Sequence, residues 1–344
     1  MTGTRVRILL VADTHLGFDL PFRPRIQRRR RGHEFFANFD RALAPAREGR
    51  VDLVVHGGDL LYRTRVPPAL VEMALAPLVR VAQQGIPVYL VPGNHERSRI
   101  QLQLWLVHPN LHIFDQPKTY LCNLPHARVA LSGFPFSRQV AGRFRDLVAQ
   151  TGWDQVRADA RMLCLHQTVE GAQVGTVNYT FRSGADVVRG EDIPGGFVAV
   201  LAGHIHRNQI LTHDLGGRSM AAPVVYPGSV ERTSFAERDE GKHYAVIEIE
   251  PTDDGAGRLM EVSFVPLPAR PMVDLIVEGG GLGAKALSRR IREQLATLDP
   301  DSVVRIEVTG RVLPEAGQVL RAENLRALAP PSMNITQKFV RTNA

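Results

Sequence analysis

A series of short, continuous apolar runs constrains the fold of this chain more than any other feature. The runs lie at residues 8–12, 51–55, 88–91, 129–131, 162–165 and 198–202. They are rich in Val, Ile and Leu and lack polar alternation, which is typical of strands buried on both faces in a sheet covered by other layers. Segments 34–46 and 68–84 have helical apolar periodicity, and we expect Pro77 to kink or break the second. This alternation predicts a layered α/β domain.

Polar side chains of one chemical kind follow five of these runs. They are Asp13 and His15, then Asp59, then Asn94 and His95, then His166, and finally His204 and His206. In open α/β sheets a ligand site lies outside the carboxyl ends of the strands. We therefore expect all five groups to converge at one edge.

The set holds two carboxylates, one amide oxygen and four or five imidazoles. This is more ligands than a single tetrahedral zinc ion binds, and it matches two adjacent divalent ions. Asp59 is the natural ligand to bridge them. Oxygen and imidazole ligands suit manganese, iron or zinc. Two such ions about 3.5–4 Å apart polarise a phosphoryl group, so the sequence predicts phosphoester hydrolysis.

The cysteines argue against thiolate chemistry. Cys122 and Cys164 are the only two in the chain and form no CxxC pair. Neither a disulfide framework nor a thiolate zinc site is expected, and a cytoplasmic location fits best. Asp13 interrupts the first apolar run before a membrane span is complete, so no membrane association is expected.

In order, the groups DTH, GD, GNH, H and GHIH resemble the calcineurin-like metallophosphoesterase superfamily. The resemblance implies a sandwich of two sheets flanked by helices. It implies one metal ion held by Asp13, His15, Asp59 and His206, and another held by Asp59, Asn94, His166 and His204. His95 would stabilise the transition state or protonate the leaving oxygen instead of binding metal.

A narrower resemblance lies in HLG after the first group, in His166-Gln167, and in YPGSVERTSF followed by GKHYAVIEI. Together these are similar to the SbcD-type double-strand-break repair nucleases. The resemblance implies hydrolysis of DNA with two divalent ions, which we expect to be Mn²⁺. We expect a nuclease domain over 1–265, a small α/β capping domain over 270–331 and a flexible tail over 332–344.

The same resemblance brings two expectations about partners, a homodimer and an SbcC-type ATPase. In that family a helical segment after the capping domain docks the ATPase, and only about a dozen polar residues follow the capping segment here, so we expect this docking segment to be absent. Tyr62 also stands where archaeal and eukaryotic repair nucleases usually have a histidine, three residues after the bridging aspartate.

Charge favours an anionic partner. Lys plus Arg is 42 and Asp plus Glu is 35, so the net charge is 42 − 35 = +7. Six arginines lie between Arg23 and Arg31, directly after the first polar group. Such runs are usually solvated surface, but beside a phosphoester site we expect DNA backbone contacts. The residues assigned this role are Arg28, Arg29, Arg30 and Arg31.

Two other functions stay open at this point. The first is a phosphodiesterase or phosphatase acting on nucleotides or other small phosphoesters, because the five groups do not specify the leaving group. The second is a DNA-end-binding subunit with little or no cleavage activity, which Tyr62 keeps under consideration. His56 is ambiguous between a structural and a site residue.

Overall fold

The computed structural model describes residues 5–20, 30–96 and 108–338. The chain divides into two compact units. The N-terminal unit comprises described residues 5–20, 32–96, 108–233 and 240–268, and the C-terminal unit comprises 30–31, 234–239 and 269–338. No helix in the described ranges has the length and apolarity that a membrane span requires.

Within the described residues, the N-terminal unit contains two six-stranded sheets. The first has the order β16-β15-β1-β2-β3-β4 and consists of β1 (Val6–Val11), β2 (Leu53–His56), β3 (Val88–Leu90), β4 (Leu111–Ile113), β15 (Lys242–Glu250) and β16 (Arg258–Leu267). The second has the order β13-β14-β12-β7-β6-β5 and consists of β5 (Lys118–Leu124), β6 (Ala127–Gly133), β7 (Ala160–His166), β12 (Ala199–Gly203), β13 (Gln209–His213) and β14 (Ser219–Tyr226).

The strands that carry the predicted site run parallel to one another within each sheet. β1, β2, β3 and β4 run parallel in the first sheet, as do β6, β7, β12 and β14 in the second. Two short pairs lie outside the large sheets: β8 (Thr168–Val169) with β11 (Val187–Val188), and β9 (Gln173–Val174) with β10 (Tyr179–Thr180).

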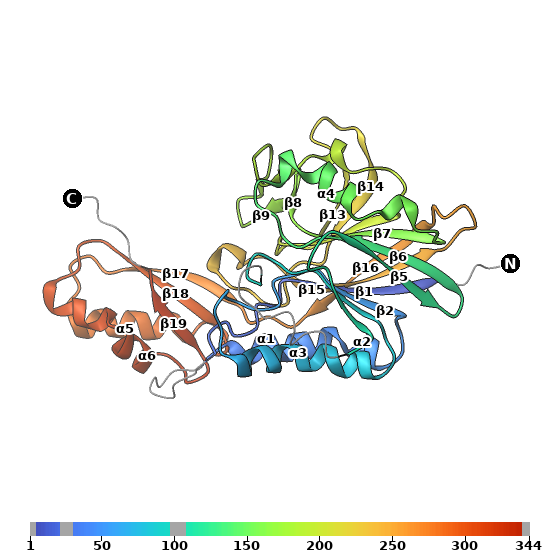
Figure 1. The fold of residues 1–344 in the computed structure, drawn as a ribbon. Coiled ribbons are helices and arrows are strands. Elements are labelled where there is room, and N and C mark those ends of the chain that lie inside the picture. Colours follow the sequence, from blue (N-terminus) through green and yellow to red (C-terminus); the bar gives the residue numbers. More distant parts are fainter. Residues whose placement is uncertain (1–4, 21–29, 97–107, 339–344) are drawn as a thin grey trace. The chain divides into compact units, whose positions relative to one another are not determined.

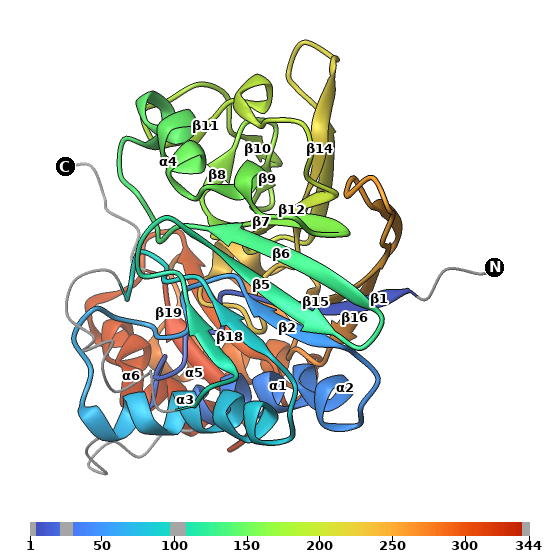
Figure 2. The ribbon, with the colours of Figure 1, turned by 45° about the vertical axis from the view of Figure 1, so that its right-hand side comes forward.

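Three apolar layers hold the N-terminal unit together. Side chains such as Ile8 and Leu10 of the first sheet pack against Val129 and Leu201 of the second, which makes the sandwich core. The helices of the unit are α1 (Gly32–Ala42), α2 (Ala44–Arg47), α3 (Pro68–Gln83) and α4 (Phe144–Gln150), and short 3₁₀ turns lie at Val140–Gly142, Trp153–Gln155 and Gly190–Asp192. Helices α1 to α3 cover the outer face of the first sheet and α4 packs on that of the second (Figures 1 and 2).

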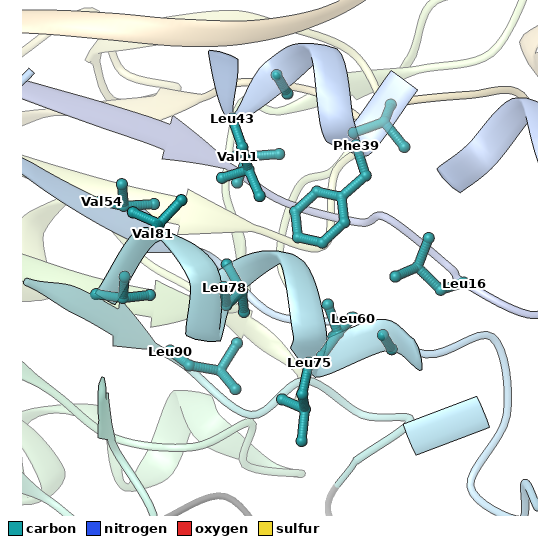
Figure 3. Packing of buried hydrophobic residues seen from close by; sticks show 14 of the residues in the cluster. Val11, Leu16, Phe39, Leu43, Val54, Leu60, Leu75, Leu78, Val81 and Leu90 are labelled. Atoms are coloured by element: carbon teal, nitrogen blue, oxygen red, sulfur yellow. The ribbon is translucent and has the colours of Figure 1, made fainter. Parts of the chain in front are cut away.

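Figure 3 shows the layer beneath α1 and α3, where Phe39 and Leu78 meet Val11 and Val54 of the first sheet. The apolar residues of these helices recur every three or four positions, so one stripe is buried. Burying a Leu or Phe side chain contributes about 1.5–3 kcal/mol. The strands that end at the site therefore rest on a well-packed support.

The C-terminal unit is a three-stranded parallel sheet with helices packed against it. Its elements are β17 (Met272–Glu278), α5 (Ala284–Leu295), β18 (Val303–Thr309), a 3₁₀ segment (Pro314–Leu320), α6 (Ala322–Leu328) and β19 (Asn334–Gln337), with a further 3₁₀ turn at Phe235–Glu237. The guanidinium of Arg305 lies 4.4 Å from the ring centroid of Phe235 and donates to both oxygens of Asp274. These contacts explain why 234–239 group with this unit although they lie within the predicted range 1–265.

Three sequence-based expectations differ from the structure. The segment 34–46 is two helices, because the first ends at Ala42 and Pro45 begins a new turn. Helix α3 continues through Pro77, so a break there was wrong. The flexible tail over 332–344 was wrong for Asn334–Gln337, because that segment pairs with β18 and buries Ile335; residues 339–344 lie outside the described residues.

Candidate metal centre

The predicted site residues come together where strands of both large sheets end. Asp13, Asp59 and Asn94 follow β1, β2 and β3 of the first sheet, whereas His166 ends β7 and His204 follows β12 of the second. The expectation of a shared edge holds, but the edge belongs to two facing sheets. A single open sheet would not bring both groups of strand ends together.

Four of these residues have left-handed backbone conformations. The φ angles are +51° for Asp13, +43° for His15, +51° for Asp59 and +89° for His204. Side chains other than glycine rarely adopt positive φ, and such strain concentrates at functional sites. Hydrogen bonds to the loop after β2 hold the backbone at Asp13 and His15. Asp13 N donates to Gly58 O at 2.9 Å, and His15 N donates to Asp59 O at 3.0 Å.

One cluster consists of Asp13, His15 and His206. The Nε2 atoms of His15 and His206 lie 3.0 Å apart, and Asp13 Oδ1 lies 4.0 Å and 3.8 Å from them. Both oxygens of Asp13 also accept the backbone N–H of His204, at 3.2 and 2.9 Å. The carboxylate therefore links the loop after β1 to the loop after β12.

A second cluster consists of Asp59, His166 and His204. The Oδ1 atom of Asn94 joins it, 3.2 Å from His166 Nε2 and 3.1 Å from His204 Nδ1. The two ring nitrogens are 3.3 Å apart, and His166 Nε2 lies 3.5 Å from Asp59 Oδ1. Asn94 thus adds a fourth possible metal ligand to the second cluster.

Asp59 also contacts His95, so it lies among four imidazoles, those of His15, His95, His166 and His204. His95 N donates to Asp59 Oδ1 at 3.1 Å, and His95 Nε2 lies 3.5 Å from Asp59 Oδ2. His15, Asp59 and His95 form a third group whose ligand-type atoms lie within 4.8 Å of one another. Among the described residues, Asp59 is the one carboxylate that belongs to two of these three groups. Its assignment as a bridging ligand stays a prediction.

Burial and the neighbouring charges shift the pKa values of the site residues in both directions. Burial alone lowers the pKa of His166, but Asp59, Asp13 and the Gly57 carbonyl raise it to about 9. Burial raises the pKa of Asp59, yet His166 and the other imidazoles bring that pKa below its usual range. For Asp13, burial raises the pKa to about 6 against the opposing effect of His166 and His206. For His204, burial and His166 lower the pKa to about 3.

The hydrogen bonding of His166 tests whether the donors fit a cation. Its Nδ1 lies 2.7 Å from the carbonyl oxygen of Gly57, so Nδ1 carries the proton of the neutral ring. With a pKa of about 9 the metal-free ring also carries a proton on Nε2, which points toward the oxygens of Asn94 and Asp59. A divalent cation would take the place of this proton, because it would meet the same two oxygens and the Nε2 lone pair. A backbone carbonyl on the other ring nitrogen is the usual support of a metal-binding histidine. The residues therefore fit a divalent metal.

A pocket of about 230 Å³ opens over both clusters. Its lining residues are His15, Asp59, Tyr62, Asn94, His95, His204, His206 and Thr233. The His95 side chain is 30% exposed, whereas that of His166 is fully buried. His95 is thus open to a ligand in the pocket. The Tyr62 ring lies nearly parallel to that of His95, with centroids 6.5 Å apart.

The sequence reasoning missed Glu96 and left His56 undecided. Glu96 is buried and accepts Leu61 N at 2.9 Å and Gly93 N at 2.8 Å, and burial together with Asp59 raises its pKa to about 8. His56 lies outside the metal-type clusters but accepts Gly58 N at 3.2 Å and lies 3.1 Å from Thr14 Oγ1. Both residues support loops that carry site residues, and the position of Glu96 directly after GNH was the available signal.

The arginine run is described only in part. Arg28 and Arg29 lie outside the described residues. Arg31 is 6% exposed, and Arg30 is partly buried. A side chain as buried as Arg31 offers little surface to a DNA backbone, and its assignment to DNA contacts stays a prediction.

Residues 6–208 match the calcineurin-like phosphoesterase family. The DNA double-strand break repair protein Mre11 of Haloferax volcanii is 30% identical over 312 residues, which cover 88% of this chain and 61% of that protein. The protein of the same name from Methanopyrus kandleri is 24% identical, covering 91% of this chain and 68% of the relative, and that from Methanosarcina mazei is 26% identical, covering 89% and 45%. This chain thus spans less than two thirds of the first and third relatives.

Two solved structures that match this chain share little sequence with it. A protein of Thermus thermophilus is 11% identical with a TM-score of 0.46, covering 77% of this chain and 100% of its own. A dimetal phosphatase from Danio rerio is 12% identical with a TM-score of 0.44, covering 76% of this chain and 99% of its own.

Proposed function

This chain belongs to the calcineurin-like phosphoesterase family, and from that premise we propose that it is a metal-dependent phosphodiester hydrolase that cleaves DNA. One observation carries the proposal. Oxygen and imidazole donors from five strand ends converge around Asp59, beneath a pocket open to substrate. The names of the Mre11 relatives support DNA as the substrate, and the net charge of +7 suits a polyanion.

The proposed ligands form two sets that share Asp59. The first set is Asp13, His15, Asp59 and His206, and the second is Asp59, Asn94, His166 and His204. Donors without thiolate support Mn²⁺ as the ion. When bound, two divalent ions supply Lewis acidity that polarises the phosphoryl group and stabilises charge on the leaving oxygen.

We assign His95 as the catalytic residue of the protein itself. Its backbone N–H and its ring nitrogen both contact Asp59, which fixes the imidazole at the pocket wall. The ring is exposed enough to meet a substrate, and an imidazole can donate a proton near neutral pH. His95 would protonate the departing sugar oxygen or stabilise the negative charge on it.

Partners and location are proposals of the same kind. A homodimer and an SbcC-type ATPase partner rest on the family resemblance, and sedimentation of the protein with and without a candidate ATPase tests both. The cytoplasmic location rests on the cysteines, because Cys122 and Cys164 are both free and buried in the described structure.

A side-by-side assay tests the function. Purified protein with Mn²⁺ receives end-labelled single-stranded DNA, end-labelled duplex DNA and a small aryl phosphodiester. We expect DNA to be cut much faster than the small ester, and Asp59→Asn to abolish both reactions. Asp159→Asn is the matched control, because Asp159 pairs with Arg128 at 3.1 Å and lies outside the clusters.

Two results would contradict this function. Cleavage of the small ester alone would identify a phosphodiesterase for small substrates. Tight DNA binding without cleavage, at any Mn²⁺ concentration, would identify a DNA-end-binding subunit.

A further inference from the structure

A group of three charged side chains lies next to the His206 side of the metal centre. The side chains of Lys242 and Glu240 are 0% and 3% exposed, and that of Arg207 is 22% exposed. Charges this buried need partners and hydrogen bonds. We propose that these three residues, the charge cluster, position His206 for metal binding, and that Lys242 is the main positioning residue. The proposal rests on the proposed function.

Lys242 donates a hydrogen bond to the backbone of His206, a predicted metal ligand. Its Nζ donates to Ser229 Oγ at 2.9 Å and to the carbonyl oxygen of His206 at 3.4 Å. Ser229 N donates to the same carbonyl at 3.1 Å. Ser229 also forms a parallel bridge with Ala12, the residue before Asp13. Lys242 therefore joins the loop that carries His206 to the loop that carries Asp13.

Glu240 balances the positive charge and extends the contacts to the next residue. Its Oε2 lies 3.8 Å from Lys242 Nζ. Its Oε1 accepts Arg207 Nε at 3.2 Å and Gly175 N at 2.8 Å. The Glu240 carboxylate thus contacts two cations. One is Lys242, which binds the His206 carbonyl, and the other is Arg207, the residue after His206.

Arg207 attaches this loop to the turn between β9 and β10. Its Nη1 donates to Asn178 Oδ1 at 2.7 Å and its Nη2 to Gly175 O at 2.6 Å. The chain is consequently fixed at the His206 carbonyl and again at the next side chain. This double attachment keeps His206 Nε2 beside His15 Nε2, where small displacements would remove a metal ligand.

The contacts of the charge cluster lead to the first of the two proposed ligand sets. Lys242 binds the His206 carbonyl directly, and through Ser229 and Ala12 it reaches the residue before Asp13. His166, by contrast, is oriented by the Gly57 carbonyl. Loosening the charge cluster should therefore weaken one ion and leave the other, whereas general destabilisation of the fold would weaken both.

Lys242→Met tests the proposal, with Lys118→Met as the matched control. Lys118 lies in β5 and pairs with Asp115, outside the metal-type clusters. Calorimetric titration with Mn²⁺, together with metal counting after dialysis, gives the affinity of each ion without an activity assay. We expect two ions for the wild type and for Lys118→Met. In Lys242→Met we expect one ion to bind within about threefold of wild type and the other about 10–100-fold more weakly, the range for a residue that supports a metal ligand.

Glu240→Gln keeps the side-chain shape and carries the test if Lys242→Met does not fold. It should weaken the same single ion, by less than Lys242→Met. Unchanged affinities in the folded variant, or an equal loss of both ions, would overturn the positioning role while the proposed function stands. A wild-type protein that binds no ion would remove the proposed function, and this inference with it.

Discussion

Replacing Gly58 by alanine tests how tightly the loop before Asp59 fits against His166. Gly58 has a φ angle of +104°, and a Cβ there would collide with the ring atoms Nδ1 and Cγ of His166 and lie 3.0 Å from Val91 O. The ring cannot move away easily, because its Nδ1 is 2.7 Å from Gly57 O and it is fully buried. The substitution should thus disturb both stability and metal binding.

The expected magnitude has two parts. A non-glycine residue at positive φ costs about 1–2 kcal/mol, and forcing an extra methyl group into a packed site costs about 1–3 kcal/mol. Gly49→Ala is the matched control, because Gly49 also has positive φ, +67°, but its Cβ would meet nothing within 4 Å. The difference between the two variants, about 1–3 kcal/mol, comes mainly from the collision with His166. The larger φ of Gly58 adds backbone strain to it.

Urea unfolding followed by tryptophan fluorescence measures the difference, because Trp153 belongs to the N-terminal unit and packs against Phe197 there. A parallel Mn²⁺ titration should show weaker binding for Gly58→Ala and unchanged binding for Gly49→Ala. If Gly58→Ala is as stable as Gly49→Ala and binds Mn²⁺ like the wild type, the described packing of His166 against this loop is wrong.

Three further predictions concern catalysis, DNA affinity and pH. His95→Ala should keep both ions and DNA binding but lower the cleavage rate about 10²–10⁴-fold; full activity in a rate assay would exclude the assigned role. Alanine at 28–30, with the buried Arg31 left intact, should weaken duplex binding and flatten its salt dependence by about one unit of slope per lost phosphate contact; an unchanged slope in filter binding would count against these contacts. The hydrogen bond from Arg305 lowers the pKa of Asp274, so its stabilisation is present above the unfolded pKa and is lost as pH falls through the folded pKa. Asp274→Asn should therefore cost about 1 kcal/mol at pH 7 and nothing in strong acid, and hydrogen exchange of β18 that shows the same deficit at both pH values would contradict this.

The strand ends could be predicted because their signals are local. Each buried run and the polar residue after it lie within a few positions, and so Asp13, Asp59 and His166 could be placed at a sheet edge from sequence alone. The division of the edge between two sheets has no local signal, since it depends on pairings such as β7 with β12, whose residues are far apart in the chain. The family resemblance alone implied two sheets.

Buried ionisable side chains were the harder part of the site to predict. Glu96 and Lys242 carry side chains that are usually solvated, and their burial depends on partners distant in sequence, such as Leu61 for Glu96 and Ser229 for Lys242. The left-handed backbone at Asp13 and Asp59 likewise has only a weak local signal, because Asp adopts positive φ more often than most residues but far less often than glycine. Hydrogen bonds between residues far apart in the chain stabilise both the buried side chains and the left-handed backbone.

The shared carboxylate of Asp59 is the central claim, and electron paramagnetic resonance of the Mn²⁺-loaded protein tests it most directly. The account predicts two ions per chain with the spectrum of an exchange-coupled pair, which requires a common ligand. Asp59→Asn should lose that coupling. Two uncoupled ions in the wild type, or a coupled spectrum that survives Asp59→Asn, would contradict the account.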